Sequence, residues 1–323
     1  MKVLIGRKIP RAGINMLRQY PELELDYRQG SPLSPEELTK AASDADAIIA
    51  VIPDKITKEL IEGAKNLKII AAYSVGFDNI DLEAATKKGI YVSNTPGELT
   101  DSVAEFAMAL MLAVGRQITR ADRFVTDGKY DYWDPMIFLG PKFAGKTLGI
   151  VGMGRIGYHF AKMCKAAFGM EILYSDVQGN IQADTELEAR HVPLEELLGN
   201  SDIVSIHVPL LPSTRHMITN HEFKLMKPTA FLINTSRGPV IDEDDLIIAL
   251  QEDWIAGAGI DVYEEEPKIR KELKELDNVV LTPHIGSATR EARIEMARMA
   301  AANVIEVLIN KKPPIHLVNK GIK

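Results

Sequence analysis

The sequence predicts an α/β fold that is divided into two units, each built around a parallel sheet. Short runs rich in β-branched residues alternate with helical stretches along the chain, which is typical of parallel sheets covered by helices. The strand-like runs are apolar without strict alternation, as expected of strands that are buried on both faces. The length of 323 residues corresponds to about two domains of roughly 100–200 residues each.

The first unit begins at the N-terminus. Its strand-like runs are KVLIG, AIIAVI, KIIAAY and IYVSN, at 2–6, 47–52, 68–73 and 90–94. Between them, Ser34 is placed to cap a helix in SPEELTKAAS, and Gly89 is placed to end the helix DLEAATKKG. The unit therefore has the strand–helix order of a parallel sheet.

The segment 98–125, ELTDSVAEFAMALMLAVGRQITRADRFV, links the two units. Within it, Ser102 and Glu105 have the spacing of a capping box, in which each side chain binds the other residue's backbone N–H. The apolar run 106–115 is too short to cross a bilayer and is typical of a buried helix. An apolar helix between two units serves either as a domain connector or as an oligomer surface.

The second unit starts near residue 147. Its strand-like runs are TLGIVG, EILYSD, DIVSIHVP, AFLINTS, IAGAGIDV and NVVLTP, in this order. Helical stretches such as DEDDLIIALQ follow most of them. The last helical segment, REARIEMARMAAANVIEVLINKKPP, ends at two prolines, and we expect it to cross back to the first unit.

Charge and cysteine content narrow the classes of function. The formal net charge is 38 − 45 = −7, which argues against nucleic acid or an anionic membrane as the main partner. The N-terminus leads directly into a strand-like run, so no signal peptide is predicted. The one cysteine, Cys164, excludes an intrachain disulfide and a multi-cysteine metal site, and no metal site is predicted. These features predict a cytoplasmic protein in which Cys164 is a buried, small hydrophobic residue.

A glycine-rich loop follows the first strand of the second unit. In TLGIVGMGRIG, Gly152, Gly154 and Gly157 form a G-x-G-x-x-G motif between a strand and a helix. In this setting the glycines permit a tight turn, a close approach of the backbone to a pyrophosphate, and close helix–strand packing. The following helix, from Arg155 and Ile156 onward, offers N–H groups and a partial positive charge to the phosphates. The motif predicts dinucleotide binding.

An acidic residue at the end of the next strand indicates which dinucleotide is bound. Asp176 lies 176 − 157 = 19 residues after Gly157. A carboxylate there accepts hydrogen bonds from the ribose hydroxyls and repels a 2′-phosphate. No Arg or Lys stands at 177–180 to bind such a phosphate. The sequence therefore predicts NAD as the cofactor, with NADP as the less preferred one.

Three motifs follow the last strand-like runs: NTSRGPVID, DVYEEEP and LTPHIGS, which start at residues 234, 261 and 281. Together with SVGFDNID, NTPGELTDSVAEFAMALML and GKTLGIVGMGRIG, they resemble the D-isomer-specific 2-hydroxyacid dehydrogenase family over nearly the whole chain. The resemblance implies two Rossmann-like or flavodoxin-like domains with parallel sheets and a cleft between them. A discontinuous substrate domain would comprise residues 1–99 plus 287–323, and a dinucleotide-binding Rossmann domain would comprise residues 100–286.

The family's reaction assigns roles to three residues. Reducing a 2-keto acid requires a hydride from the nicotinamide, a proton for the carbonyl oxygen and a cation for the substrate carboxylate. His284 is the expected general acid, because imidazole gives and retakes protons near neutral pH. Glu266 would hold the far ring nitrogen and fix its tautomer, whereas Glu264 and Glu265 are expected to be solvated. Arg237 is the expected substrate clamp, since guanidinium presents a rigid fork to carboxylate and keto oxygens.

The resemblance also implies further contacts. Backbone N–H groups of Val75 and Gly76 would bind the substrate carboxylate opposite Arg237, unless they form only a strand-to-helix turn. Asp261 would accept from the nicotinamide carboxamide, unless it is only a turn residue, and His207 would border the nicotinamide, unless it is a structural histidine. The remaining expected cofactor contacts are Val208, Pro209, Thr235, Ser236, Arg237, His284 and Gly286.

Single positions disfavour several branches of the family. Phosphoglycerate dehydrogenases usually carry an arginine where Ile52 and Pro53 stand, and many have a C-terminal regulatory extension. Phosphite-oxidising members have a lysine where Val75 stands, and formate dehydrogenases have a glutamine where Glu266 stands. The stretch YDYWDPMIFLGPKFAGKTLGIVGMGRIG is most similar to glyoxylate/hydroxypyruvate reductases. This similarity implies reduction of glyoxylate or hydroxypyruvate to the D-2-hydroxy acid.

Alternatives remain for both activity and assembly. An NAD(H)-sensing, corepressor-like binding protein is the alternative from another class, and a D-lactate or D-3-phosphoglycerate dehydrogenase is the alternative within the family. The resemblance further implies a homodimer, with Trp133 near the partner subunit and the helix 102–116 as the apolar dimer surface. A monomer in which this helix is simply buried is the other possibility.

Overall fold

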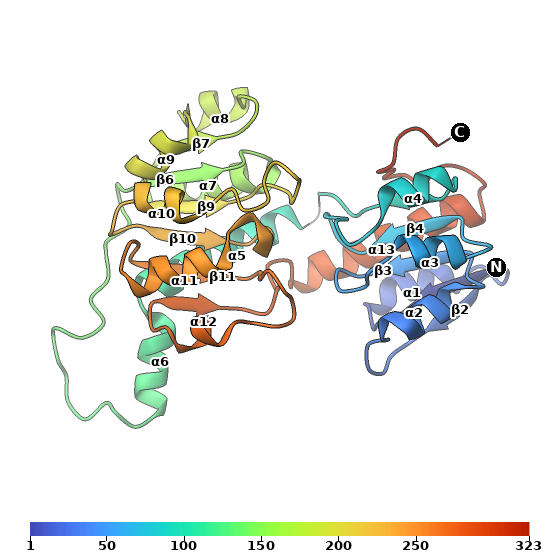
Figure 1. Cartoon of the computed structure of the whole chain (residues 1–323), viewed down its shortest axis with the longest axis horizontal. Coiled ribbons are helices and arrows are strands. Elements are labelled where there is room, and N and C mark those ends of the chain that lie inside the picture. Colours follow the sequence, from blue (N-terminus) through green and yellow to red (C-terminus); the bar gives the residue numbers. More distant parts are fainter. Residues whose placement is uncertain (98, 323) are drawn as a thin grey trace. The chain divides into compact units, whose positions relative to one another are not determined.

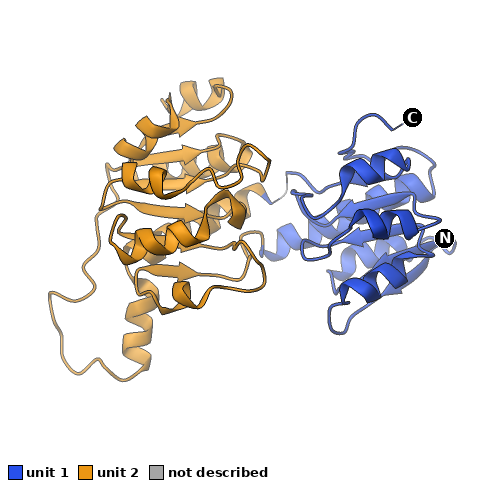
Figure 2. Ribbon diagram, in the orientation of Figure 1, with its two compact units in different colours: residues 1–99, 288–323 blue, residues 100–287 orange. Residues whose placement is uncertain are grey.

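The structure of the chain is a computed structural model that describes residues 1–97 and 99–322 (Figure 1). Glu98, the first residue of the expected linking segment, and Lys323, the last of the expected first domain, lie outside the described residues. The chain divides into two compact α/β units: unit 1 comprises residues 1–99 and 288–323, and unit 2 comprises residues 100–287 (Figure 2). The prediction of an α/β fold with two parallel sheets is confirmed.

Unit 1 is built on a sheet whose strands run in the order β2-β1-β3-β4-β5, and every neighbouring pair is parallel. The strands are β1 (Lys2–Ile5), β2 (Glu24–Tyr27), β3 (Ala47–Ala50), β4 (Ile69–Ala72) and β5 (Tyr91–Ser93). Its helices are α1 (Arg11–Leu17), α2 (Pro35–Ala42), α3 (Lys58–Gly63), α4 (Leu82–Lys87) and α13 (Arg290–Leu308). Strands β3 and β4 are buried along their whole length, as their continuous apolar sequences predict.

Local signals explain several helix ends in unit 1. Ser34 caps α2: its hydroxyl accepts from Glu37 N, and the Glu37 carboxylate accepts from Ser34 N at 2.8 Å. Helix α13 returns to unit 1 as expected and packs on α1, where a Cβ at Gly13 would overlap the carbonyl of Ala297. The edge strand β2 was not predicted, because its sequence ELDY is short and largely polar.

Unit 2 is built on a sheet with the strand order β12-β11-β10-β9-β6-β7-β8, again with parallel neighbours. The strands are β6 (Thr147–Val151), β7 (Glu171–Ser175), β8 (Arg190–His191), β9 (Ile203–Ile206), β10 (Phe231–Asn234), β11 (Gly257–Ile260) and β12 (Val279–Leu281). The helices are α5 (Thr100–Gly115), α6 (Ile118–Thr126), α7 (Arg155–Phe168), α8 (Ile181–Glu186), α9 (Leu194–Asn200), α10 (Asn220–Leu225), α11 (Glu243–Gln251) and α12 (Lys271–Glu275).

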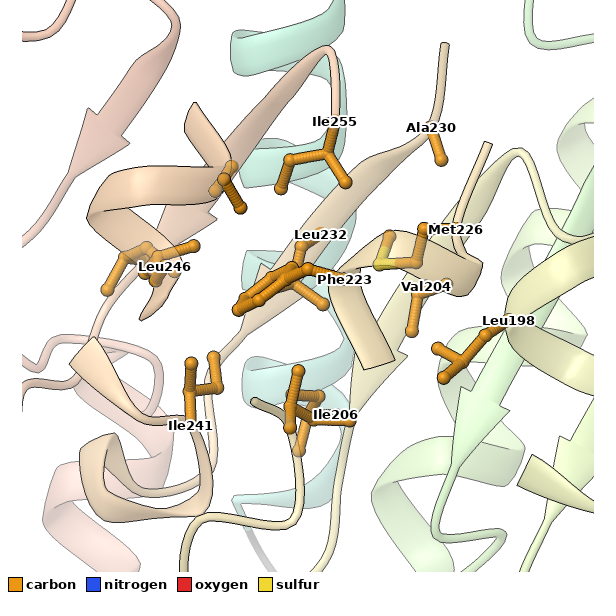
Figure 3. Packing of buried hydrophobic residues seen from close by; sticks show 14 of the residues in the cluster. Leu198, Val204, Ile206, Phe223, Met226, Ala230, Leu232, Ile241, Leu246 and Ile255 are labelled. Carbon is orange, nitrogen blue, oxygen red and sulfur yellow. The ribbon is translucent and has the colours of Figure 1, made fainter. Parts of the chain in front are cut away.

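The strand order creates a switch point between β6 and β9. From β6 the chain continues to β7 on one side, and it later returns to β9 on the other side. In open α/β sheets, ligands bind beyond the carboxyl ends of the strands at such a point. A cluster of buried side chains from β9, β10, α10 and α11 meets around Phe223 and Leu232 and fixes this part of the sheet (Figure 3).

The linking segment is not one helix. It is divided into α5 and α6 because Gln117 adopts a left-handed conformation, with φ at 51°. Helix α5 begins at Thr100, so Ser102 lies inside its first turn and the capping box expected at Ser102 is wrong. The apolar side of α5 packs against α7, β10 and β11 within unit 2.

Cys164 is buried in α7, as predicted, and this burial raises the pKa of its thiol to about 12. In the described part of the chain, every helix is too short or too polar to traverse a bilayer.

Candidate active site

The glycine loop lies between β6 and α7, at the switch point. Gly152 has φ at +97°, and a Cβ on it would lie 2.8 Å from Val208 Cγ1 and 2.9 Å from the carbonyl carbon of His207. At Gly157, a Cβ would overlap the carbonyl oxygen of Gly152. These two positions therefore require glycine for the turn and for packing.

Gly154 differs from its two neighbours in the motif. A Cβ there would meet nothing within 4 Å, so the space beyond the N-terminus of α7 is open. Arg155 and Ile156 are the first residues of this helix, as expected. A helix N-terminus with open space in front of it suits a phosphate group, because its N–H groups have no partners within the helix.

Asp176 follows β7 and faces an open pocket of about 470 Å³, which is lined by Met153 and the residues from Asp176 to Gln182. Its Oδ2 accepts from Met153 N at 2.8 Å, and its Oδ1 accepts from Val177 N at 2.7 Å. These bonds fix the carboxylate beside the glycine loop and leave each oxygen a lone pair for a further donor.

His207, Val208 and Pro209 follow β9. The His207 ring bonds Ser205 Oγ through Nε2 at 2.9 Å and packs 5.6 Å from the Phe160 ring of α7. Burial lowers the pKa of His207 to about 3, so the ring is neutral. The ring therefore has a structural environment, whereas the backbone of His207 and both the backbone and the side chain of Val208 border Gly152.

The turn after β10 presents Thr235, Ser236 and Arg237. It is shaped by Asn234, which was not predicted: its Oδ1 accepts from Ser236 N and Oγ, and its Nδ2 donates to Arg237 O at 3.1 Å. The guanidinium of Arg237 donates to Ser236 O at 2.8 Å. Thr235 Oγ1 is buried and has no hydrogen-bond partner within the described residues.

Asp261, at the end of β11, organises the turn that carries His284. Its buried carboxylate accepts from Thr282 Oγ1 at 2.6 Å, from Ile285 N at 2.9 Å and from Gly286 N at 2.7 Å. Burial raises the pKa of Asp261, although these hydrogen bonds act in the opposite direction. The backbone N–H of His284 also donates to Asp261 O at 2.9 Å. The Asp261 side chain thus stabilises the turn that carries His284.

His284 and Glu266 form a pair. His284 Nδ1 lies 2.8 Å from Glu266 Oε2, and Glu266 Oε1 accepts from Tyr263 N at 3.1 Å. The two side chains are 21% and 29% exposed, so a substrate can reach them. His284 has φ at +55°, which is uncommon for a residue other than glycine and persists only where surrounding contacts enforce it.

The three residues expected to be catalytic come from neighbouring strands. Arg237 follows β10, Glu266 follows β11, and His284 follows β12, and these strands are adjacent in the sheet. A Cβ at Gly238 would overlap the backbone of Tyr263, so the Arg237 turn lies directly against the Glu266 turn. The expectation that Glu264 is solvated was wrong, because it is paired with His216, whereas Glu265 is exposed.

Val75 and Gly76 follow β4 in unit 1. Their loop is fixed by Ser74 Oγ, which donates to Gly76 O at 2.6 Å, and by Asn94 Nδ2, which donates to Val75 O at 2.8 Å. Among the hydrogen bonds within the described ranges, none is donated by the backbone N–H of Val75 or Gly76.

Comparison with known proteins assigns this arrangement to a family. Residues 108–286 match the family model of the D-isomer specific 2-hydroxyacid dehydrogenase, NAD binding domain. A curated glyoxylate reductase of Thermococcus litoralis is 52% identical over 99% of this chain and 97% of its own length. The chain belongs to the D-isomer-specific 2-hydroxyacid dehydrogenase family.

Solved structures agree with membership of the 2-hydroxyacid dehydrogenase family. A protein of Thermus thermophilus is 40% identical, covers 98% of this chain and 100% of its own, and superposes with a TM-score of 0.92. An NADPH-dependent glyoxylate/hydroxypyruvate reductase of Sinorhizobium meliloti, solved with NADP and malonate, is 29% identical with a TM-score of 0.86 and covers 98% of this chain and 96% of its own.

The residues of this 2-hydroxyacid dehydrogenase fit a nicotinamide dinucleotide. The open space at Gly154 admits a pyrophosphate, and Asp176 presents a carboxylate beside a pocket. The buried hydroxyl of Thr235 gains the hydrogen-bond partner that it lacks among the described residues when a cofactor amide or hydroxyl lies against it. The enzyme is an NAD-dependent dehydrogenase, with use of NADP consistent with its relatives.

Proposed function

We propose that this dehydrogenase reduces a short 2-keto acid, glyoxylate or hydroxypyruvate, to the D-2-hydroxy acid. The pair of His284 Nδ1 and Glu266 Oε2 at 2.8 Å is the observation that carries the proposal, because it supplies a proton donor whose tautomer is fixed. The name of the Thermococcus litoralis relative, glyoxylate reductase, supports the choice of substrate. When bound, the nicotinamide cofactor supplies the hydride.

The proton comes from His284. Glu266 accepts from Nδ1, so the proton to be transferred is carried on Nε2, which faces away from Glu266. The imidazolium gives this proton to the keto oxygen. Glu266 holds the ring in place during the transfer, and its negative carboxylate stabilises the positive charge of the imidazolium. The Asp261 hydrogen bonds hold the backbone of the same turn.

Arg237 binds the substrate carboxylate and polarises the keto oxygen. Its turn is fixed by Asn234 and lies against the Glu266 turn, so the guanidinium is placed by contacts on two sides. We keep Val75 and Gly76 as proposed donors to the substrate carboxylate, since their N–H groups donate to nothing within the described ranges. On this proposal unit 1 is the substrate domain and unit 2 is the dinucleotide-binding domain.

The cofactor is held by unit 2. Gly152, Gly154 and the first turn of α7 would face the pyrophosphate, and Asp176 would accept from the ribose hydroxyls. Thr235, Ser236 and Gly286 would border the nicotinamide half, together with the backbone of His207, Val208 and Pro209. Asp261 Oδ2 accepts one hydrogen bond from the turn and retains a lone pair for the carboxamide.

We also propose a homodimer and a cytoplasmic location, the latter supported by the single, buried cysteine. We keep the helix 102–116 as part of the proposed dimer surface, although one side of α5 packs within unit 2. Further apolar surface lies on α6, which has no buried residue along its described length, and on the loop after it, and both extend from the body of unit 2 (Figure 1). The most exposed are Tyr132, Trp133 and Met136, at 74%, 75% and 71%.

Light scattering tests the dimer. The wild type should have twice the mass of the chain. The variant Trp133→Glu should have the mass of the monomer, because the substitution places a charge among the exposed apolar side chains of the loop after α6. Ile315→Glu, an exposed position in unit 1, is the matched control. A monomeric wild type would refute the assembly.

A kinetic panel tests the activity. The purified protein is mixed with glyoxylate, hydroxypyruvate, pyruvate or 3-phosphohydroxypyruvate and with NADH or NADPH, and kcat/KM is compared. We expect the highest values for glyoxylate or hydroxypyruvate with NADH. Tight NADH binding without turnover of any 2-keto acid would instead support a dinucleotide-sensing protein.

A further inference from the structure

A second histidine–carboxylate cluster lies next to the turns of Arg237 and Glu266 in unit 2. His216, in the loop after β9, is hydrogen-bonded through Nε2 to Glu264 Oε1. Its Nδ1 lies 3.6 Å from Asp242 Oδ2. The N–H of Glu264 donates to Oε2 of the buried Glu243 at 3.0 Å. The imidazole therefore lies between two carboxylates, Glu264 and Asp242, and a third, Glu243, binds the backbone of Glu264.

The backbone of His216 binds the other turn. Its N–H donates to Pro239 O at 2.8 Å, within the segment that begins at Arg237. Two residues later, Ile218 pairs with Ile241 in a parallel bridge. His216 has φ at +49°, a left-handed conformation that surrounding contacts must enforce in a residue other than glycine. The loop is thus fastened to the 237–241 segment at this residue.

Glu264 lies two residues before Glu266 in the same turn. That turn touches the Arg237 segment directly, since a Cβ at Gly238 would overlap the Tyr263 carbonyl. His216 is hydrogen-bonded to both segments: its backbone holds one through Pro239, and its side chain holds the other through Glu264. His216 thus adds a hydrogen-bonded connection between the two segments beside the glycine contact.

We propose that His216 is a positioning residue for the reduction, because it holds the 263–266 turn on the 237–240 turn. It thereby fixes the position of the Glu266–His284 hydrogen bond relative to Arg237. The inference rests on the proposed function of those three residues, and it adds one that touches neither substrate nor cofactor.

Charge explains why a side chain without a hydrogen-bond donor should not replace His216. The carboxylates that face the ring are Glu264 from its turn and Asp242 from the start of α11. Glu243, the next residue of α11, bonds the N–H of Glu264 and has Arg270 near it. Burial raises the pKa of Glu243, and the neighbouring Glu264 charge adds to this rise. Without the imidazole, Glu264 stands beside these carboxylates with no donor on its Oε1, and the turn is expected to move away from them.

The first test is His216→Phe, which keeps an aromatic ring and removes both nitrogen atoms. We expect kcat to fall by about tenfold to a hundredfold, as for a displacement of catalytic groups by about 1 Å, with an unchanged KM for NADH. The pH profile of kcat should also change, because Glu266 then holds His284 less well. His216→Gln places an amide donor near the position of Nε2 and should recover most of the kcat. The control is His221→Gln, an exposed position on α10 that should behave as wild type.

A purely structural role would give a different result. If His216→Phe lowers the melting temperature while kcat and the pH profile stay unchanged, the proposal is overturned. Should this variant fail to fold, Glu264→Ala decides in the same way, since it removes the other half of the pair.

An activity-independent measurement separates the two proposals. The ring signals of His284 can be followed by NMR against pH in wild type and His216→Phe, with His284→Asn to assign them. An unchanged His284 titration in His216→Phe would overturn the positioning role. A wild type that reduces no 2-keto acid would overturn the proposed function instead, even if the titration shifts.

Discussion

The carboxylate of Asp261 accepts a hydrogen bond from the N–H of Gly286 at 2.7 Å, inside the turn that carries His284. Asp261→Asn replaces one acceptor oxygen by an amide that cannot accept from a backbone N–H. We expect a loss of about 1–3 kcal/mol in the free energy of unfolding, because a buried donor loses its partner. Urea denaturation measures this loss, and kcat should fall with it as the His284 turn shifts. An unchanged unfolding free energy would show that the turn does not depend on the carboxylate.

His284→Asn tests the proton donor without straining the backbone, since asparagine tolerates the left-handed conformation at φ +55°. We expect kcat to fall by about 10²–10⁴-fold, the usual contribution of a general acid. NADH affinity, measured by fluorescence titration, should barely change. Loss of NADH binding with this variant would mean that the histidine belongs to the cofactor site.

Arg237→Lys keeps the charge but loses the planar fork that binds carboxylate through two parallel hydrogen bonds. We expect kcat/KM for the keto acid to fall about a hundredfold, with a higher KM, because a charge-assisted bidentate contact is lost. The dissociation constant for NADH serves as the internal control. Equal activity of the lysine variant would argue against a bidentate clamp.

Asp176→Ala tests the cofactor preference. Removing the carboxylate should lower kcat/KM for NADH and raise it for NADPH, since the repulsion of a 2′-phosphate is relieved. The ratio of the two values is the measurement. Because the Asp176 side chain also accepts from Met153 N, a modest loss of thermal stability should accompany the change. A wild type that already prefers NADPH would contradict the assignment.

The neutral ring of His207 makes stability depend on pH. Burial holds its folded pKa at about 3, compared with the ordinary value of 6.5. The unfolded chain therefore takes up a proton below about pH 6.5 that the folded chain refuses, and stability falls as the pH is lowered from there towards 3. We expect urea midpoints to decline between about pH 7 and pH 5, and His207→Gln should flatten this decline. The exposed His221→Gln should retain the slope of the wild type.

Much of the framework was predictable because its signals are local. The glycines at 152, 154 and 157 sit between a strand and a helix, and Ser34 precedes Glu37 by three residues, so short sequence windows carried the information. The wrong or missing predictions depended on residues distant in sequence. Glu264 resembled a solvated turn residue because its partner His216 lies 48 positions earlier. The role of Asp261 as a turn organiser likewise depends on Thr282, Ile285 and Gly286, which lie far along the chain. Asn234 is a different case, because its partners Ser236 and Arg237 are close in sequence.

The linking segment shows a second kind of error. Its apolar pattern predicted helix correctly, but the left-handed conformation that separates α5 from α6 is adopted by Gln117, a residue whose type gives no signal for it. The pattern also could not tell which partner covers the apolar side of α5, which is taken up by β10, β11 and α7.

Because β10, β11 and β12 are adjacent, the proposed reactive groups all lie at one end of these strands, and the other end is free of them. The proposed reactive groups all follow the carboxyl ends of these strands, whereas the opposite ends, near Pro228, Ala256 and Asn278, carry none of them. That opposite rim is therefore the place for a fused tag, an immobilising tether or relocated chain ends in a circularly permuted enzyme. Such alterations there should spare turnover, while even a one-residue insertion on the reactive rim would displace a proposed catalytic side chain.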